Sequence, residues 1–189
     1  MAQNSKREHI VETAINLFCQ SGFHATGVDR IMREAGVSKK TLYNHFESKD
    51  ALILACLEKY DVLFRTSFVT QVESKADDPK GRLLAIFDVA EDWFTSQNFF
   101  GCMFINVIGE YSAPDSPFRS ISKDFKNLMK SYILNLTTEA KASDPQKLAD
   151  EWAILLEGAI VTAQVMEQAS AAQTAKFTAT LLLEHYCKG

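Results

Sequence analysis

The sequence predicts an all-α protein of about nine helices, and three observations support this. Apolar residues recur at helical spacing, as at Ile10, Ala14 and Leu17. No stretch alternates apolar and polar residues as a half-buried strand would. The four prolines and eight glycines stand between periodic stretches rather than inside them. We expect an N-terminal three-helix domain, residues 1–48, and a larger helical domain, residues 49–189.

Several helix ends can be placed from local residues. The first helix should end near Ser21–Gly22, and Ser48 should be the N-cap of a later one. Pro79 suits the first turn of a helix, and Ser143–Pro145 opens another. The last helix should cover about 172–187.

Composition indicates a globular chain. Of its 189 residues, 47% are hydrophobic, which is enough to form a core. The longest apolar run, Ala51–Leu57, is far shorter than the roughly 18 residues that a membrane span needs. No apolar segment follows the first charges, as it would in a secretion signal. We therefore expect a cytoplasmic protein without a membrane partner.

The four cysteines, Cys19, Cys56, Cys102 and Cys187, show no C-x-x-C spacing and no clustering with histidine. We expect no metal site and no cofactor. Their default role is that of small buried apolar residues.

The distribution of charge limits where nucleic acid could bind. The net charge is −4 overall, but residues 1–50 carry seven Lys and Arg against six Asp and Glu, a net +1. The remainder therefore carries −5. A nucleic-acid surface must lie within the first 50 residues.

Residues 23–50 predict two short helices joined by a tight turn. Thr26 followed by Asp29 resembles a capping box that would start the first of them. Ile31, with Met32 or Ala35, supplies its apolar side. Gly36 supplies the positive φ that a tight interhelical turn requires.

The second short helix shows a clear division of its residues. Ser38 should cap it, while Leu42 and Phe46 face inward. Its outward residues would be Lys39, Lys40, Thr41, Tyr43, Asn44 and His45. Cations at a helix N-terminus oppose the helix dipole, so an ordinary solvated turn explains them poorly. The pair has the pattern of a helix-turn-helix, whose second helix enters the DNA major groove.

Residues 10–52 resemble the DNA-binding domain of TetR-family repressors. The resemblance rests on A-x-x-L-F-x-x-x-G-F over 14–23, on Thr26, and on A-G-V-S-K-x-T-L-Y-x-H-F-x-S-K over 35–49. It implies that the chain binds operator DNA. The implied DNA-binding residues are Thr26, Ser38, Lys39, Lys40, Thr41, Tyr43, Asn44, His45 and Lys49.

The resemblance also implies separate roles within this set. Residues 39–41 would contact base edges, with Asn44 a weaker candidate. Tyr43, His45 and Lys49 would hold the DNA backbone. Thr26 and the helix it caps would receive a phosphate on free backbone N–H groups, whereas Asp29 would only cap.

TetR-like proteins pair through their last two long helices, so the resemblance implies a homodimer. The candidate interface residues are Gly158, Ala159, Ala163, Phe177 and Leu181. The alternative is that these residues fill the core of a single chain.

An aromatic-rich stretch between the two ends is a candidate site for a small apolar effector. Polar residues interrupt it at Asn106, Glu110 and Gln164. The candidate ligand-binding residues are Phe87, Trp93, Cys102, Phe104, Asn106, Tyr111 and Trp152. Such aromatic residues also commonly form ordinary core.

Residues 101–106 resemble a G-C-x-F-x-N segment at the start of the central helix in one subset of these regulators. A cysteine at a helix N-terminus has a lowered thiol pKa, so Cys102 is an alternative sensor of electrophiles or oxidants. The Gly-Cys pair could instead permit tight helix packing.

No catalytic motif occurs, and the four histidines are scattered, so we do not expect an enzyme. A helical protein–protein adaptor would not explain Lys39 to Tyr43. The sequence therefore predicts a ligand-responsive transcriptional regulator. The resemblance implies a repressor that binds a palindromic operator as a homodimer and is released by its effector.

Overall fold

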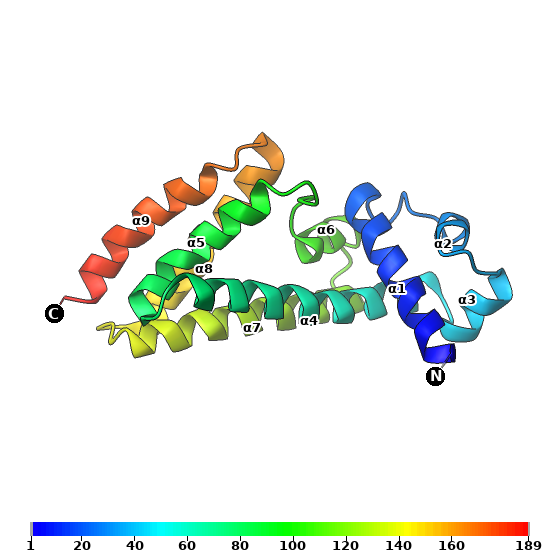
Figure 1. Cartoon of the computed structure of the whole chain (residues 1–189), viewed down its shortest axis with the longest axis horizontal. Coiled ribbons are helices and arrows are strands. Elements are labelled where there is room, and N and C mark those ends of the chain that lie inside the picture. Colours follow the sequence, from blue (N-terminus) through cyan, green and yellow to red (C-terminus); the bar gives the residue numbers. More distant parts are fainter. Residues whose placement is uncertain (1, 189) are drawn as a thin grey trace. The chain divides into compact units, whose positions relative to one another are not determined.

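The structure is a computed structural model that describes residues 2–188, with side chains from residue 5 onward. Within that range it contains nine helices and no strand, which confirms the all-α prediction (Figure 1). The helices are α1 (Ala2–Ser21), α2 (Val28–Glu34), α3 (Lys39–His45), α4 (Lys49–Lys75), α5 (Pro79–Phe94), α6 (Met103–Glu110), α7 (Pro117–Glu139), α8 (Pro145–Met166) and α9 (Ala171–Tyr186).

The helix starts follow from local capping. The Ser38 hydroxyl accepts the Thr41 N–H at 3.1 Å, and the Ser48 hydroxyl accepts the Ala51 N–H at the same distance. Asp78 and Asp144 cap α5 and α8, each directly before a proline in the first turn. These starts agree with the prediction.

The chain forms two compact units. The first unit runs to Phe64 and includes Cys102–Phe125, and the second comprises Arg65–Gly101 and the chain from Lys126 onward. Helices α4 and α7 contribute residues to both. The predicted boundary after residue 48 separates two functional domains and not two compact units, so it stays a prediction.

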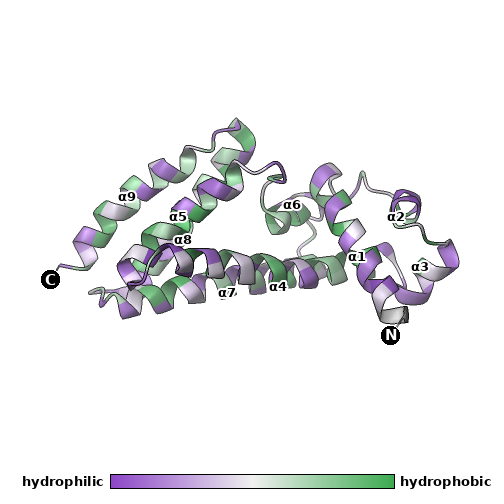
Figure 2. Cartoon of the chain, in the orientation of Figure 1, coloured by the Kyte–Doolittle hydropathy of each residue, from purple (hydrophilic) through white to green (hydrophobic). Residues whose placement is uncertain are grey.

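The core of the first unit is aromatic and aliphatic. Phe18 stacks on Phe23 with ring centroids 4.9 Å apart, and both side chains are buried, as is Leu42 of α3. Farther along, Phe104 of α6 stacks on Phe125 of α7 at 4.0 Å. Helix α6 is hydrophobic along most of its length (Figure 2).

The second unit is built on α5, α8 and α9, which pack against one another. Phe87 and Trp152, both fully buried, lie with ring centroids 5.6 Å apart between α5 and α8. The Lys176 ammonium donates to the Asp88 carboxylate at 2.7 Å, which ties α9 to α5. Among the described helices, none is long and apolar enough to cross a membrane.

Candidate nucleic-acid interface

The turn between α2 and α3 holds two short helices at a fixed angle. Gly36 has φ +62°, the left-handed conformation that the prediction required. The Val37 N–H donates to the Met32 carbonyl at 3.0 Å and closes the turn. Ile31 and Leu42 are fully buried, so both helices bury one face in the same core.

Helix α3 presents a polar surface to solvent. Lys39, Lys40, Tyr43 and Asn44 are exposed, and these positions share one side of the helix. The Lys39 ammonium lies 6.0 Å from the centre of the Tyr43 ring. The neighbouring Thr41 and His45 are half-buried. Four of the six predicted α3 residues therefore share one exposed side of the helix.

Thr26 occupies a different position from the predicted one. Gly27 is the N-cap of α2 and makes no side-chain cap bond. The Thr26 hydroxyl, fully buried, donates to the Gly22 carbonyl at 2.7 Å and lies 3.3 Å from the Leu17 carbonyl. The capping-box prediction is therefore wrong, because this hydroxyl is directed back to the Gly22 and Leu17 carbonyls and not to the start of α2. Asp29 lies exposed in the first turn of α2.

Lys49, predicted to hold the DNA backbone, is bound within the protein. Its ammonium donates to the Phe23 carbonyl at 2.5 Å. Burial lowers the pKa of Lys49, and the nearby carboxylates of Glu110 and Asp50 partly offset this.

Glu110 was named from the sequence only as a polar residue of the aromatic-rich stretch, and its contact with the α1–α2 connection was not predicted. Its carboxylate accepts the Phe23 N–H at 2.7 Å and the His24 N–H at 2.6 Å, and it lies 3.4 Å from the His24 imidazole. A carboxylate at the C-terminal end of a helix opposes the dipole and therefore needs donors from elsewhere. A glutamate at the end of a predicted helix was therefore the one sign in the sequence that Glu110 needs hydrogen-bond donors from another part of the chain.

The predicted effector-binding residues fall into separate groups. Phe87, Trp93 and Trp152 belong to the second unit, whereas Cys102, Phe104, Asn106 and Tyr111 belong to the first. Phe87 contacts Trp152, whose buried indole N–H has no acceptor in the described structure. Trp93 packs instead on Phe94 and Phe99.

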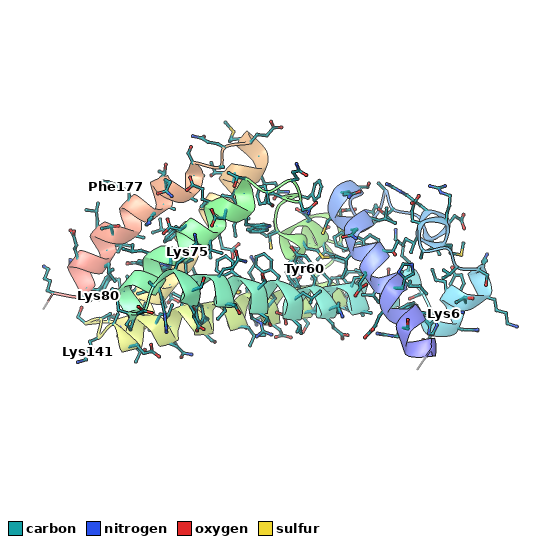
Figure 3. All side chains as sticks on the ribbon, in the orientation of Figure 1. Lys6, Tyr60, Lys75, Lys80, Lys141 and Phe177 are labelled. Atoms are coloured by element: carbon teal, nitrogen blue, oxygen red, sulfur yellow. The ribbon has the colours of Figure 1, made fainter. Side chains whose placement is uncertain are left out.

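The remaining members of this group lie in the first unit. Phe104 contacts Tyr60 of α4, with centroids 6.1 Å apart, and the Tyr60 side chain points toward α6 (Figure 3). Tyr111 packs on Phe118 at 4.6 Å. Burial raises the pKa of both tyrosine hydroxyls.

Cys102 lies at the N-cap of α6, as predicted, but is only 5% exposed. Burial, aided by the nearby Cys102 thiol, raises the pKa of Cys19 to about 11. Among the described residues, no group of three His, Cys, Asp or Glu side chains could hold a metal ion.

The predicted dimer residues divide between core and surface. Ala159 and Ala163 are buried within the chain, whereas Gly158, Phe177 and Leu181 are exposed. Figure 3 shows Phe177 on the outer side of α9. Four further apolar residues of α8 are exposed and were not among the predicted interface residues: Ile154, Val161, Val165 and Met166.

A groove of about 400 Å³ lies on this outer surface. Ile154 and Gly158 of α8 and Thr174 of α9 are among its lining residues. A second groove, about 280 Å³, lies between α7 and α8 beside the Lys126–Glu157 ion pair. Neither is lined by a predicted effector-binding residue.

Comparison with known proteins places this arrangement in a family. Residues 10–56 match the family described as bacterial regulatory proteins, tetR family, and residues 79–178 match the tetracyclin repressor-like C-terminal domain. The two matches cover α2, α3 and most of the second unit. The chain belongs to the TetR family.

Two curated relatives illustrate the extent of the similarity. The chain is 31% identical to the uncharacterized HTH-type transcriptional regulator YerO of Bacillus subtilis over 134 residues, 69% of this chain but only 46% of YerO. It is 26% identical to the transcriptional regulator AcuR of Cereibacter sphaeroides over 166 residues, 84% of this chain and 76% of AcuR. Both are described as transcriptional regulators.

Solved structures share the fold over nearly the whole length. The TetR-family regulator SCO4454 of Streptomyces coelicolor superposes with a TM-score of 0.88 at 27% identity, covering 97% of both chains. The reduced form of Escherichia coli NemR superposes with a TM-score of 0.84 at 20% identity, covering 94% of this chain and 96% of that one. The latter likeness concerns the fold alone.

Proposed function

We propose that this chain is a DNA-binding transcriptional regulator whose α3 enters the major groove. The observation that carries the proposal is the exposed surface formed by Lys39, Lys40, Tyr43 and Asn44 behind a glycine turn. Its buried side, Leu42 and Phe46, fixes α3 in the core, so the exposed side chains are held in one orientation. Acting on the chromosome would place the protein in the cytoplasm.

The exposed residues suit two kinds of DNA contact. Lys39, Lys40 and Thr41 lie in the first turn of α3, where a recognition helix meets base edges. Tyr43 and His45 would hold phosphates, while Ser38 keeps the first turn ordered. A fully buried Thr26 hydroxyl leaves only nearby backbone N–H groups for a phosphate.

We propose that the regulator is a homodimer paired through α8 and α9. The support is the exposed apolar surface of Ile154, Val161, Val165, Phe177 and Leu181. Contiguous apolar surface is unfavourable in water and marks interaction sites. A homodimer would present two copies of α3 to a palindromic operator.

We also propose release from DNA by a small, largely apolar effector bound in the second unit. The unpartnered indole N–H of Trp152, beside Phe87, is a donor that such a molecule could satisfy. The thiol alternative is less well supported, because Cys102 is buried and an attacking reagent needs access. NemR and DhaR are described as repressors and FasR as an activator, and repression is the role we propose here.

A binding assay tests the proposed function. DNA selected by the wild-type protein from a random duplex pool should be retarded in a gel, and a Lys39/Lys40/Thr41 triple alanine variant should bind at least tenfold more weakly, a loss of about 1.4 kcal/mol. A Lys123/Lys147 double alanine variant, which removes two exposed lysines outside α3, is the control and should bind as the wild type does. Full affinity in the triple variant, or no sequence selected at all, would contradict the proposal.

A further inference from the structure

The Phe23–His24 peptide, which precedes the proposed DNA-reading helices α2 and α3, is hydrogen-bonded through both its carbonyl and its N–H. The Phe23 carbonyl accepts a hydrogen bond from the Lys49 ammonium at 2.5 Å. The His24 N–H of the same peptide donates to Glu110 at 2.6 Å, and the Phe23 N–H donates to the other carboxylate oxygen at 2.7 Å. We call this arrangement the Glu110–Lys49 clamp.

The backbone around the clamp is shaped to admit Glu110. Gly22 has φ +80°, and a Cβ there would lie 2.9 Å from the Glu110 carboxylate. Glycine is therefore required both by its conformation and by the closeness of the carboxylate. Tyr111, the next residue after Glu110, adds a ring contact with His24 at 4.5 Å between centroids.

Both charged groups stand at helix ends that disfavour their charge. Glu110 is the last residue of α6 and Lys49 is the first residue of α4. A carboxylate is disfavoured by the C-terminal end of a helix dipole, and a cation by the N-terminal end. The hydrogen bonds of the clamp offset that cost, so each charge depends on the clamped peptide for its stabilisation.

The clamped peptide has little freedom relative to the DNA-reading helices. Phe23 is fully buried and stacks on Phe18 of α1. Only four residues separate Phe23 from Val28, the first residue of α2. Two of these four positions are fixed, His24 by the clamp and Thr26 by its buried hydroxyl. A displacement at the end of α6 is therefore transmitted to the start of α2.

We propose that Glu110 and Lys49 are positioning residues that couple α6 energetically to the DNA-reading helices, and that Lys49 holds the Phe23–His24 peptide rather than a DNA phosphate. This inference rests on the proposed DNA binding by α3. Because coupling is reciprocal, occupancy of α3 by DNA must in turn stabilise α6.

Hydrogen–deuterium exchange tests the coupling without a known effector. Binding of pool-selected DNA to the wild type should slow amide exchange in α3 and also in α6, Met103–Glu110, by roughly fivefold or more. In Glu110→Ala the α3 protection should persist at saturating DNA while the α6 protection is lost. Glu110→Gln, which keeps one acceptor oxygen, should restore part of it.

The control is Glu58→Ala, which removes an exposed carboxylate from α4 and should retain the full α6 response. Thermal melting shows whether each variant folds. If Glu110→Ala does not fold, the exchange experiment is made with Glu110→Gln, whose α6 protection should be smaller than that of the wild type. Equal α6 protection in wild type and Glu110→Ala, or none in wild type, overturns the coupling. Absence of DNA binding by the wild type would instead remove the proposed function itself.

The salt dependence of DNA affinity tests the role of Lys49. A lysine that neutralises a phosphate contributes about one unit to the slope of log affinity against log salt concentration. Lys49→Met should therefore weaken binding at every salt concentration and leave the slope unchanged. Lys59→Met, a change in the same helix at a lysine paired with Glu12 of α1, is the matched control. A slope reduced by about one in Lys49→Met alone would assign Lys49 to a phosphate.

Discussion

Thr26 illustrates at the scale of a single residue how a buried hydroxyl can stabilise the connection between two helices. Its hydroxyl is buried and donates to the carbonyl of Gly22, the residue that follows α1. A buried carbonyl without a donor is costly, so the side chain stabilises the α1–α2 connection. Thr26 is thus a structural residue of the turn, three residues after Phe23.

Thr26→Val tests this structural role. Valine has nearly the same shape but no hydroxyl, so the free energy of unfolding should fall by about 1–3 kcal/mol. Urea denaturation provides the measurement, and Thr26→Ser, which keeps the donor, should lose less. Unchanged stability together with weaker DNA binding would indicate that the hydroxyl contacts DNA.

Cys19 allows a prediction on thiol chemistry. Because burial raises its pKa to about 11, roughly one thiol in a thousand is ionised at pH 8. Alkylation by iodoacetamide should therefore be slow at pH 8 and accelerate about tenfold per pH unit up to about pH 10. Mass spectrometry of the Cys19 peptide measures this rate, and a plateau below pH 9 would contradict the raised pKa.

At the scale of helices, the sequence predicts what local interactions determine. Ser38 and Ser48 cap helices through hydrogen bonds to residues three positions later, so their roles are visible within a short window. Glu110 pairs with Phe23 across 87 positions, and no local pattern specifies that contact. The Thr26 capping prediction failed for a similar reason, since its hydroxyl donates to the Gly22 and Leu17 carbonyls, which precede it, and not to the helix that follows.

The connection between α5 and α6 offers a prediction on helix packing. Gly101 has φ +80°, and a Cβ there would lie 2.0 Å from the side-chain amide of Gln164 in α8. Gly101→Ala should lower the free energy of unfolding by about 1–2 kcal/mol from backbone strain, with an added loss from displacing Gln164. In a Gln164→Ala background the cost should shrink to the backbone part alone.

Gly109 of α6 provides the opposite case. A Cβ there meets nothing within 4 Å, and alanine is the better helix former by roughly 0.8–1 kcal/mol. Gly109→Ala should therefore raise the midpoint of thermal unfolding. Equal destabilisation by Gly101→Ala and Gly109→Ala would contradict the difference in packing between the two sites.

At the scale of the whole molecule, α8 and α9 expose apolar side chains that the fold of a single chain leaves uncovered. Helix α8 buries one stripe through Trp152, Leu156 and Ala163 and exposes another through Ile154 and Val165. Sequence periodicity located the buried stripe but did not separate it from the second one, because α8 is apolar on both sides. Ile154 lines a groove that it shares with Ala171 and Thr174 of α9.

Phe177 and Ala163 separate assembly from folding. Phe177 is 70% exposed in the single chain, so Phe177→Glu should leave the fold intact. In the proposed dimer the new carboxylate would be buried without a partner, and the protein should sediment as a folded monomer at micromolar concentration. Operator affinity should then fall sharply, because two half-sites are no longer held together. Ala163→Glu, at a buried position, should instead unfold the chain itself. A Phe177→Glu protein that remains dimeric and binds DNA as the wild type does would show that α9 pairs elsewhere or not at all.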